Sequence, residues 1–191
     1  GAVAVVVDNA PEARPQSGLA DAPVVFEVPV EGGRTRFLAV FPADAIVAEV
    51  GPVRSARPYL LGLAHLIGTP LTHVGGSPDA LALLRQTGWA HVDQYYDPPF
   101  RRVTFRHAPF NVYTSIATLA AFAETHHLIP SHANDAPGAL WSFRKDVPLG
   151  DAATGTSVRI PYGDSAHTVE WVYDAQRGAY QRHQAGRDHR D

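Results

Sequence analysis

A strand, a glycine turn and a helix are predicted in direct succession by the run Leu71-Thr72-His73-Val74-Gly75-Gly76-Ser77-Pro78 and the residues after it. The first four residues indicate a short buried strand. Ser77 suits the N-cap of a helix and Pro78 its first turn, so we expect a helix that ends near Gly88. A strand joined to a helix by a tight turn is typical of α/β folds.

The segments on either side of this run fit the same fold class. Residues 2–7 are apolar and rich in valine, which predicts a buried strand. The run 56–67 predicts a helix with Pro58 in its first turn, and a further helix is expected from Ser115 to His127. We therefore expect an α/β fold, with a mixed sheet and flanking helices, over residues 1–130.

Two strand-like runs, residues 24–30 and 35–41, flank Gly32-Gly33 and predict a β-hairpin with a two-residue loop. Strand alternation then predicts one apolar face, made of Phe26, Val28, Val30, Thr35, Phe37, Ala39 and Phe41. The other face would carry Glu27 and Glu31 beside Arg34 and Arg36. Two carboxylates on one face suit acid–base work, but the two arginines more simply neutralise them.

The C-terminal part of the chain has a different character. Residues 131–138 are rich in turn formers, and residues 140–143 indicate a strand. Further strands are expected at 157–161, 168–173 and 179–183. We expect residues 139–191 to form a β-rich appendage to the α/β body.

Composition excludes several classes of protein. The 191 residues carry a formal net charge of −3, so no general basic field favours nucleic acid or a membrane surface. The absence of cysteine excludes disulfides, thiolate metal sites and catalytic thiols. No apolar run is long enough to span a membrane, and no Walker, dinucleotide-binding or H-E-x-x-H pattern occurs, so no cofactor or metal is expected.

Two arginines, Arg54 and Arg57, stand three residues apart where a loop turns into a helix. A helix N-terminus has free N–H groups and a partial positive charge, so this place attracts phosphate or carboxylate. Topology can bring Arg14 and the amides of Gly75 and Gly76 to the same edge of the sheet. The alternative is a structural network, in which the arginines pair with Asp8, Glu12, Glu27 or Glu31.

Several sequence motifs also resemble the YerB-like bacterial lipoproteins. They are Asp8-Asn9, residues 13–19, 31–39 and 51–58, His73 with residues 75–78, and residues 111–115, with further agreement at 172–174, 180–182 and 188–191. The resemblance implies a domain of unknown function, tethered outside the cytoplasmic membrane through a lipidated cysteine that lies outside this chain. This chain differs from the family pattern at Phe110, where the pattern has a histidine. A looser likeness links the chain to the LytR–CpsA–Psr cell-wall transferases, which hold a polyprenyl pyrophosphate with arginines.

Three functional hypotheses follow. The first is an extracytoplasmic binding domain whose arginines hold a small anionic ligand or envelope component. The second is an envelope phosphotransferase or hydrolase acting on a pyrophosphate-linked substrate, with Glu27 or His73 as base. The third is a protein-interaction scaffold. The candidate ligand-binding residues are Asp8, Asn9, Arg14, Gln16, Ser17, Glu27, Arg36, Arg54, Ser55, Arg57, His73, Gly75, Gly76, Ser77, Asn111 and Tyr113.

Overall fold

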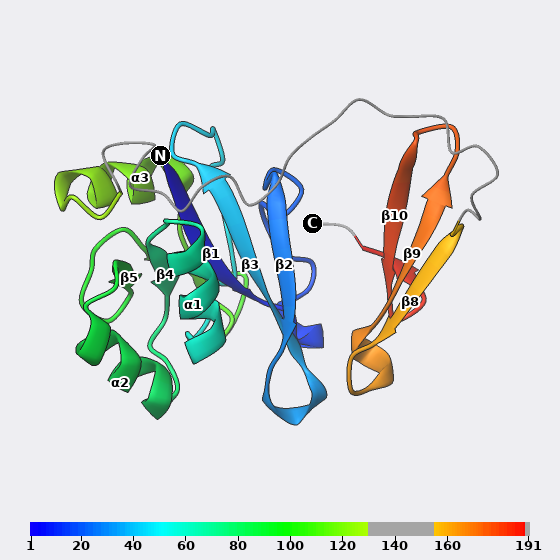
Figure 1. Ribbon diagram of the computed structural model, residues 1–191, viewed down its shortest axis with the longest axis horizontal. Coiled ribbons are helices and arrows are strands. Elements are labelled where there is room, and N and C mark those ends of the chain that lie inside the picture. Colours follow the sequence, from blue (N-terminus) through cyan, green and yellow to red (C-terminus); the bar gives the residue numbers. More distant parts are fainter. Residues whose placement is uncertain (130–154, 190–191) are drawn as a thin grey trace.

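A five-stranded mixed sheet forms the centre of the α/β body (Figure 1). The computed structural model describes residues 1–129 and 155–189. The strand order is β2-β3-β1-β4-β5. The strands span Ala2–Asp8 (β1), Val24–Pro29 (β2), Thr35–Pro42 (β3), Leu71–His73 (β4) and His91–Asp93 (β5).

Strand direction changes at β1. On one side β1 pairs antiparallel with β3, which pairs antiparallel with β2. On the other side β1 runs parallel to β4, and β4 runs parallel to β5. The chain therefore leaves the carboxyl end of β1 at a topological switch point, where open α/β sheets commonly bind ligands.

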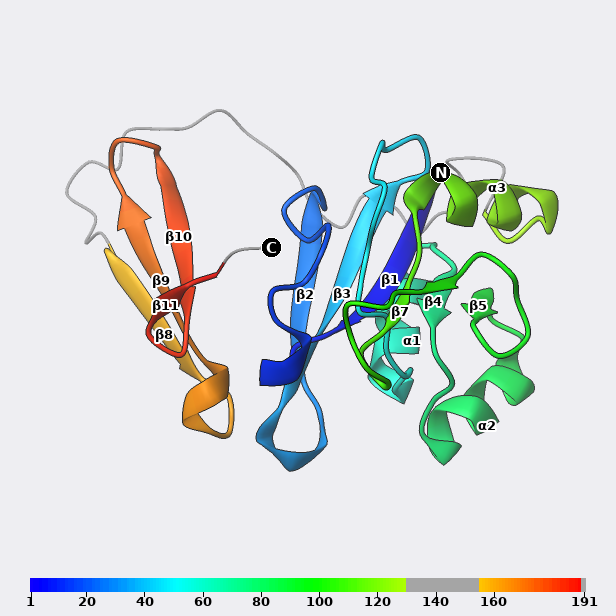
Figure 2. The same cartoon turned by 180° about the vertical axis from the view of Figure 1, so that it is seen from behind.

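Both faces of this sheet are buried by helices (Figure 2). Helices α1 (Pro58–Leu66) and α2 (Pro78–Thr87) cover the face that carries Ala4, Val6 and Leu38. Helix α3 (Ile116–Thr125) covers the face that carries Val3, Val5 and Phe37. The valine-rich β1 is thus buried on both sides, as an apolar strand without alternation predicts.

The three helices are confirmed, and their ends follow the expected signals. Ser77 accepts a hydrogen bond from the amide of Ala80, and Gly88 ends α2 in the left-handed conformation with φ 63°. Ser115 caps α3 by accepting from the amide of Thr118. Helix α1 begins at Pro58 rather than at residue 56, because the chain before it remains extended at Arg57.

The predicted two-residue hairpin loop is wrong, and with it the predicted face assignment. Glu31, Gly32 and Gly33 form a three-residue turn closed by a hydrogen bond from the amide of Val30 to the carbonyl of Arg34. One extra residue reverses the parity of the pairing, so Phe26 lies opposite Leu38 and Glu27 lies opposite Phe37. Glu27 therefore lies on the same face of the sheet as Phe37, and not on the face that carries Arg36.

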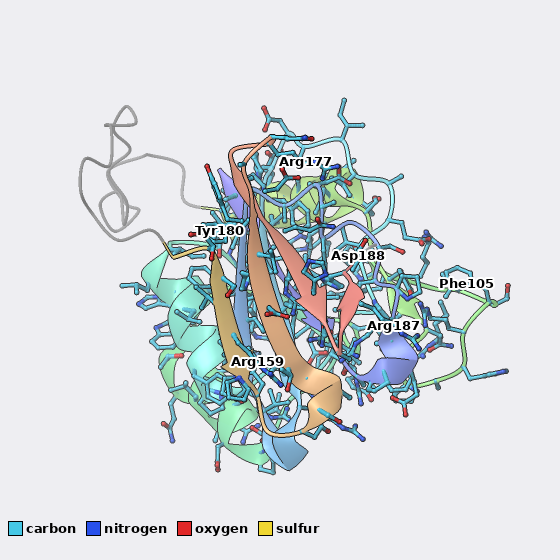
Figure 3. All side chains as sticks on the ribbon, turned by 90° about the vertical axis from the view of Figure 1, so that its right-hand side faces the viewer. Phe105, Arg159, Arg177, Tyr180, Arg187 and Asp188 are labelled. Atoms are coloured by element: carbon cyan, nitrogen blue, oxygen red, sulfur yellow. The ribbon has the colours of Figure 1, made fainter. Side chains whose placement is uncertain are left out.

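Four further strands form a second sheet, in the order β11-β10-β9-β8. They span Ser157–Pro161 (β8), Thr168–Asp174 (β9), Ala179–Gln184 (β10) and Arg187–Asp188 (β11). This sheet lies beside β2 of the body (Figure 1), and Figure 3 looks from the sheet towards the body. A third, two-stranded sheet joins β6 (Arg101–Arg102) to β7 (Val112–Tyr113). The strand predicted at 140–143 lies outside the described residues.

Candidate anion-binding site

The segment between residues 50 and 57 crosses the carboxyl ends of β1 and β4. The amide of Arg54 donates to the carbonyl of Val6 (2.9 Å), and its carbonyl accepts from the amide of Val74 (3.1 Å). The amide of Ala56 donates to the carbonyl of Gly75 (2.9 Å). Backbone hydrogen bonds on both sides therefore hold the arginine-bearing segment at the switch point.

Asp8, the last residue of β1, is the anionic centre of this edge. It is 5% exposed, and its Oδ1 accepts from the amide of Ala10 (2.7 Å). Its Oδ2 accepts from Nε of Arg54 (2.9 Å) and lies 3.8 Å from Nε of Arg36. One carboxylate therefore neutralises part of the charge of two arginines.

Arg36 is the most deeply buried cation of the group. Its Nη1 donates to the carbonyl of Ser55 (2.7 Å), whereas its buried Nε has no hydrogen-bond partner among the described residues. Burial, followed by the neighbouring positive charge of Arg57, lowers the pKa of Arg36 to about 10. An incompletely satisfied guanidinium in this position favours an additional acceptor.

Arg57 is fully engaged with the hairpin turn. Its Nε and Nη2 donate to both carboxylate oxygens of Glu31 at 2.7 to 2.9 Å, and its Nη1 donates to the carbonyl of Ala56. The hydrogen bond from Arg57 lowers the pKa of Glu31 to about 2. This part of the site is the ion-pair network that the alternative interpretation predicts.

Arg54 differs from its neighbours because part of its guanidinium remains available. Its side chain is 23% exposed, and it donates only through Nε, to Asp8. Within the described part of the chain, its Nη1 and Nη2 have no hydrogen-bond acceptor. Phe110 lies against this guanidinium, with 5.7 Å between the ring centroid and Cζ. The guanidinium of Arg54 thus binds Asp8 through Nε and contacts the ring of Phe110.

Asn9 organises the other half of the cluster. It is fully buried, and its Nδ2 donates to Glu27 Oε1 (3.1 Å) and Thr35 Oγ1 (2.7 Å). Its Oδ1 accepts from Arg14 Nε (3.2 Å) and Gln16 Nε2 (3.0 Å). These contacts use both amide hydrogens and both lone pairs of Asn9. The side chain of Asn9 is therefore fully hydrogen-bonded within the protein.

The second sheet completes this network with residues that sequence reasoning missed. Arg182 of β10 donates to Glu27 Oε2 (2.7 Å), and His189 Nε2 lies 3.1 Å from Gln16 Oε1. His167, 1% exposed, places its Nε2 3.2 Å from the carbonyl of Asn9. No local spacing links these residues to the body, because 155 positions separate Glu27 from Arg182.

Eight of the predicted residues meet at this edge, directly or through one another. They are Asp8, Asn9, Arg14, Gln16, Glu27, Arg36, Arg54 and Arg57, and Ser55 joins them through its carbonyl. The body thus gathers most of the expected cations, together with enough acceptors to hold several of them.

The predicted role of the glycine turn is wrong for Gly75. Its amide donates to Asp93 Oδ1 (2.9 Å) and so is not available to an anion. Ser77 caps α2, while Gly76 pairs with Ala56 in a β-bridge. His73 is fully buried, and its Nδ1 lies 2.8 Å from the carbonyl of Gly75. The turn therefore binds the arginine-bearing segment through its backbone, while the amide of Gly75 and the hydroxyl of Ser77 are used within the protein.

The remaining candidates lie in separate contacts. Ser17 donates to Glu49 Oε1 (3.0 Å), and Asn111 Oδ1 accepts from Arg102 Nη1 (2.8 Å). Tyr113 is fully buried against Gly51, where an added Cβ would lie 2.6 Å from the ring. The glycine at position 51 is thus required by close packing, not by a ligand.

Two features are absent from the part of the chain that the structure describes. Residues 1–129 and 155–189 contain no cluster of three or more histidine, cysteine, aspartate or glutamate side chains that could hold a metal. Over the same residues, no helix is both long enough and apolar enough to cross a membrane.

Comparisons with known proteins agree with the fold and the motifs. Residues 1–129 match the family described as "Protein of unknown function (DUF3048) N-terminal domain". The chain is 35% identical over 189 residues to the "Putative lipoprotein YerB" of Bacillus subtilis (strain 168), a match that covers 96% of this chain and 55% of that protein. The chain therefore spans little more than half the length of this curated relative.

A solved structure extends the similarity to three dimensions. The crystal structure of the YerB protein from Bacillus subtilis matches with a TM-score of 0.83 at 34% identity, over 100% of this chain and 63% of that one. These comparisons do not bear on the looser likeness to the LytR–CpsA–Psr transferases. Sequence and structure agree that the chain belongs to the DUF3048 family of YerB-like proteins.

Proposed function

We propose that this domain binds a small phosphate- or carboxylate-bearing ligand at the carboxyl end of β1. Arg54 would contact the anion through Nη1 and Nη2, while Asp8 holds its Nε. The observation that carries the proposal is that, among the described residues, Nη1 and Nη2 of Arg54 have no hydrogen-bond partner, on a side chain that is 23% exposed. A planar guanidinium with two free donors is suited to bidentate recognition of an oxyanion.

The charge balance of this edge supports the same function. Three guanidiniums, those of Arg36, Arg54 and Arg57, face two carboxylates, those of Asp8 and Glu31, which leaves one positive charge in excess. Arg36 Nε, which has no hydrogen-bond partner among the described residues and lies 3.8 Å from Asp8 Oδ2, adds to the local positive potential near Arg54. An anion would complete the charge balance of a partly buried group, which surface solvation alone does less well.

Binding without turnover is favoured over catalysis. Glu27 accepts from Asn9, Thr35 and Arg182, so its carboxylate is held in a satisfied network. His73 is fully buried and bonded to Gly75 and His91. Both candidate bases are therefore held by protein partners, and among the described residues neither hydrogen-bonds to Arg54, whereas a general base must reach the bound substrate.

We also propose that the domain acts outside the cytoplasmic membrane, attached through a lipid anchor. The relative with which it shares 35% identity is named a lipoprotein, and the similarity covers almost all of this chain. The natural ligand would then be an anionic group of the cell envelope. Free phosphate and a lipid-linked pyrophosphate share the chemistry that Arg54 recognises, so the test must separate them.

The test is the thermal stability of the domain with phosphate, pyrophosphate and a short-chain polyprenyl pyrophosphate. A bound anion raises the melting temperature with concentration, and we expect Arg54→Gln to abolish that rise. Glutamine keeps an N–H donor for Asp8 but removes the positive charge and the paired Nη1 and Nη2 donors of the guanidinium. Arg177→Gln, at a side chain that is 75% exposed, is the matched control and should respond like wild type.

Each outcome decides the proposal. A larger shift with the polyprenyl compound than with pyrophosphate identifies a lipid-linked ligand, and equal shifts identify the phosphate group alone. If Arg54→Gln melts too low to assay, Arg54→Lys retains the positive charge beside Asp8 and should bind pyrophosphate more weakly. An unshifted wild-type melting temperature, or equal shifts in wild type and Arg54→Gln, would overturn the proposal.

A further inference from the structure

A pocket lies between helix α2 and the edge strand β5, and none of the arginines near the end of β1 lines it. Its volume is about 490 Å³, within the range typical of small-molecule sites. Leu81 and Leu84 of α2 line one side, and His91 of β5 lines the other. Tyr95 and Tyr96 stand at its edge, 68% and 86% exposed. An apolar wall, two phenol rings and an imidazole therefore share one cavity.

The hydrogen bonds of a histidine pair fix the proton positions in this pocket. His73 Nδ1 lies 2.8 Å from the carbonyl oxygen of Gly75, which can only accept, so Nδ1 carries the proton. Nε2 of a neutral His73 is then an acceptor, and it lies 3.1 Å from His91 Nδ1. His91 must therefore donate from Nδ1, which leaves its Nε2 with a free lone pair.

Burial keeps His73, and so its hydrogen bond to His91, in one protonation state. His73 is fully buried, and loss of solvation lowers its pKa, so the ring is neutral near pH 7. The carboxylate of Asp93 lies 3.9 Å from Nδ1 of His73 and accepts from the amides of Gly75 and Tyr95 through Oδ1. The geometry of the turn thus determines which nitrogen of His91 is basic.

Arg85 adds a free cation to the same pocket. It lies in the last turn of α2 and lines the cavity with His91. Within residues 1–129 and 155–189 its guanidinium has no hydrogen-bond or ion-pair partner. The pocket therefore offers one strong donor, one defined acceptor and a surface on which a ring can stack.

We propose that this pocket is a second binding site, specific for a small ring-bearing molecule that carries an anionic group and a hydroxyl. Arg85 binds the anionic group, His91 Nε2 accepts from the hydroxyl, and Tyr95 and Tyr96 contact the ring. His73 is a positioning residue, because it sets the tautomer of His91 without touching the ligand. The proposal uses none of the arginines at the end of β1, so it does not depend on the first site.

The first test is the tautomer of His91, measured by nitrogen-15 NMR on the wild-type domain near pH 7. We expect a protonated Nδ1 and an unprotonated Nε2. His126, at the end of α3 with Nδ1 2.9 Å from the carbonyl of Phe122, serves as an internal reference for the same protonation pattern. An Nε2-protonated His91 would overturn the proposal, because its ring could not accept the ligand's hydroxyl.

The second test is binding of 3- and 4-hydroxybenzoate, followed by chemical-shift changes at pocket residues. Benzoate lacks the hydroxyl and phenol lacks the charge, so wild-type protein alone measures the value of each contact. We expect benzoate to bind several-fold more weakly than the better hydroxybenzoate, the effect of losing one neutral hydrogen bond of about 1 kcal/mol. Equal affinity for benzoate and both hydroxybenzoates would overturn the role of His91.

Two variants complete the experiment. We expect Arg85→Gln to weaken hydroxybenzoate binding about tenfold or more, as loss of a charged hydrogen bond does, and His91→Phe to remove the preference for the hydroxyl. Arg177→Gln, on the second sheet, is the control and should bind like wild type. Absence of any shift at pocket residues with any of the four compounds, or unchanged binding in Arg85→Gln, would contradict a binding site here.

Discussion

Asn9 is the residue on which the candidate site most depends. Its side chain makes four hydrogen bonds, two donated and two accepted, and none of its surface is exposed. The partners come from the loop after β1 and from both strands of the hairpin. One amide therefore joins segments that are up to 26 positions apart.

We predict that Asn9→Ala lowers the free energy of unfolding by about 3 kcal/mol, because it leaves several buried polar groups without a partner. Urea denaturation followed by circular dichroism measures the change. Asn111→Ala is the matched control, since Asn111 Oδ1 makes a single contact with an exposed arginine. The control should lose less than about 0.5 kcal/mol, as surface substitutions usually do. Equal losses in the two variants would contradict this account of Asn9.

Sequence reasoning predicted the members of this cluster better than their roles. Charge near a predicted helix start identified Arg54 and Arg57, and strand ends identified Asp8. The sequence could not show which guanidinium has all its hydrogen-bond donors paired, because the partner of Arg57, Glu31, lies in the turn of a hairpin that is distant in the chain. The unpartnered nitrogens of Arg54 became evident only once every neighbouring acceptor had a position.

At the level of elements, the hairpin of β2 and β3 shows how one residue changes a prediction. Gly32-Gly33 correctly indicated a tight turn, and both glycines have positive φ, 72° and 71°. Glu31 belongs to the turn as well, so the turn has three residues and the faces of β2 exchange. Local sequence contains no signal for this choice, and the partner of Glu31 in the turn, Arg57 at the start of α1, lies 26 positions further along the chain.

That contact gives a prediction for pH dependence. Arg57 lowers the pKa of Glu31 to about 2 in the folded protein. The ion pair therefore stabilises the fold fully at pH values above the pKa of Glu31 in the unfolded chain, and this stabilisation is lost as the pH falls towards 2. At neutral pH we expect Glu31→Gln to be less stable than wild type by under about 1 kcal/mol, because Glu31 is largely exposed. The difference should shrink below about pH 4.5, the ordinary value for glutamate.

The measurement is a series of urea denaturation curves for both proteins from neutral to acidic pH. Glu124→Gln, on an exposed part of α3, controls for the general effect of removing a glutamate, and Glu124 makes no ion pair within the described residues. A wild-type advantage that stays constant down to pH 2 would show that the Arg57 contact does not contribute through charge.

At the level of the whole molecule, the body and the second sheet meet through a few polar and aromatic contacts. Arg182 of β10 binds Glu27 of β2, and its guanidinium lies 5.3 Å from the ring of Phe37 and 6.0 Å from that of Trp171. A pocket of about 230 Å³ remains beside these side chains. Three of the four strands of the second sheet were predicted from the sequence, but the position of the sheet against the body was not, because no short-range pattern encodes this pairing.

This meeting point gives the prediction that tests the architecture most directly. Glu27 and Arg182 side chains are each only 11% exposed, so Arg182→Met leaves a buried carboxylate with two neutral donors, Asn9 and Thr35. We expect a loss of about 3 kcal/mol in the free energy of unfolding, as for other broken buried pairs. Arg177→Met, in the exposed turn between β9 and β10, should lose less than about 0.5 kcal/mol.

A double-mutant cycle separates the ion pair from the packing of the long side chain. Glu27→Gln keeps an oxygen for Asn9 and Thr35 but removes the charge, so it should relieve part of the cost of Arg182→Met. We expect a coupling energy of about 1 to 3 kcal/mol, the range for residues in direct contact. Hydrogen exchange of the β9 and β10 amides, measured on the same variants, shows whether the second sheet depends on this pair. Additive losses, with exchange unchanged in both strands, would mean that the aromatic contacts rather than the charges hold the second sheet to the body.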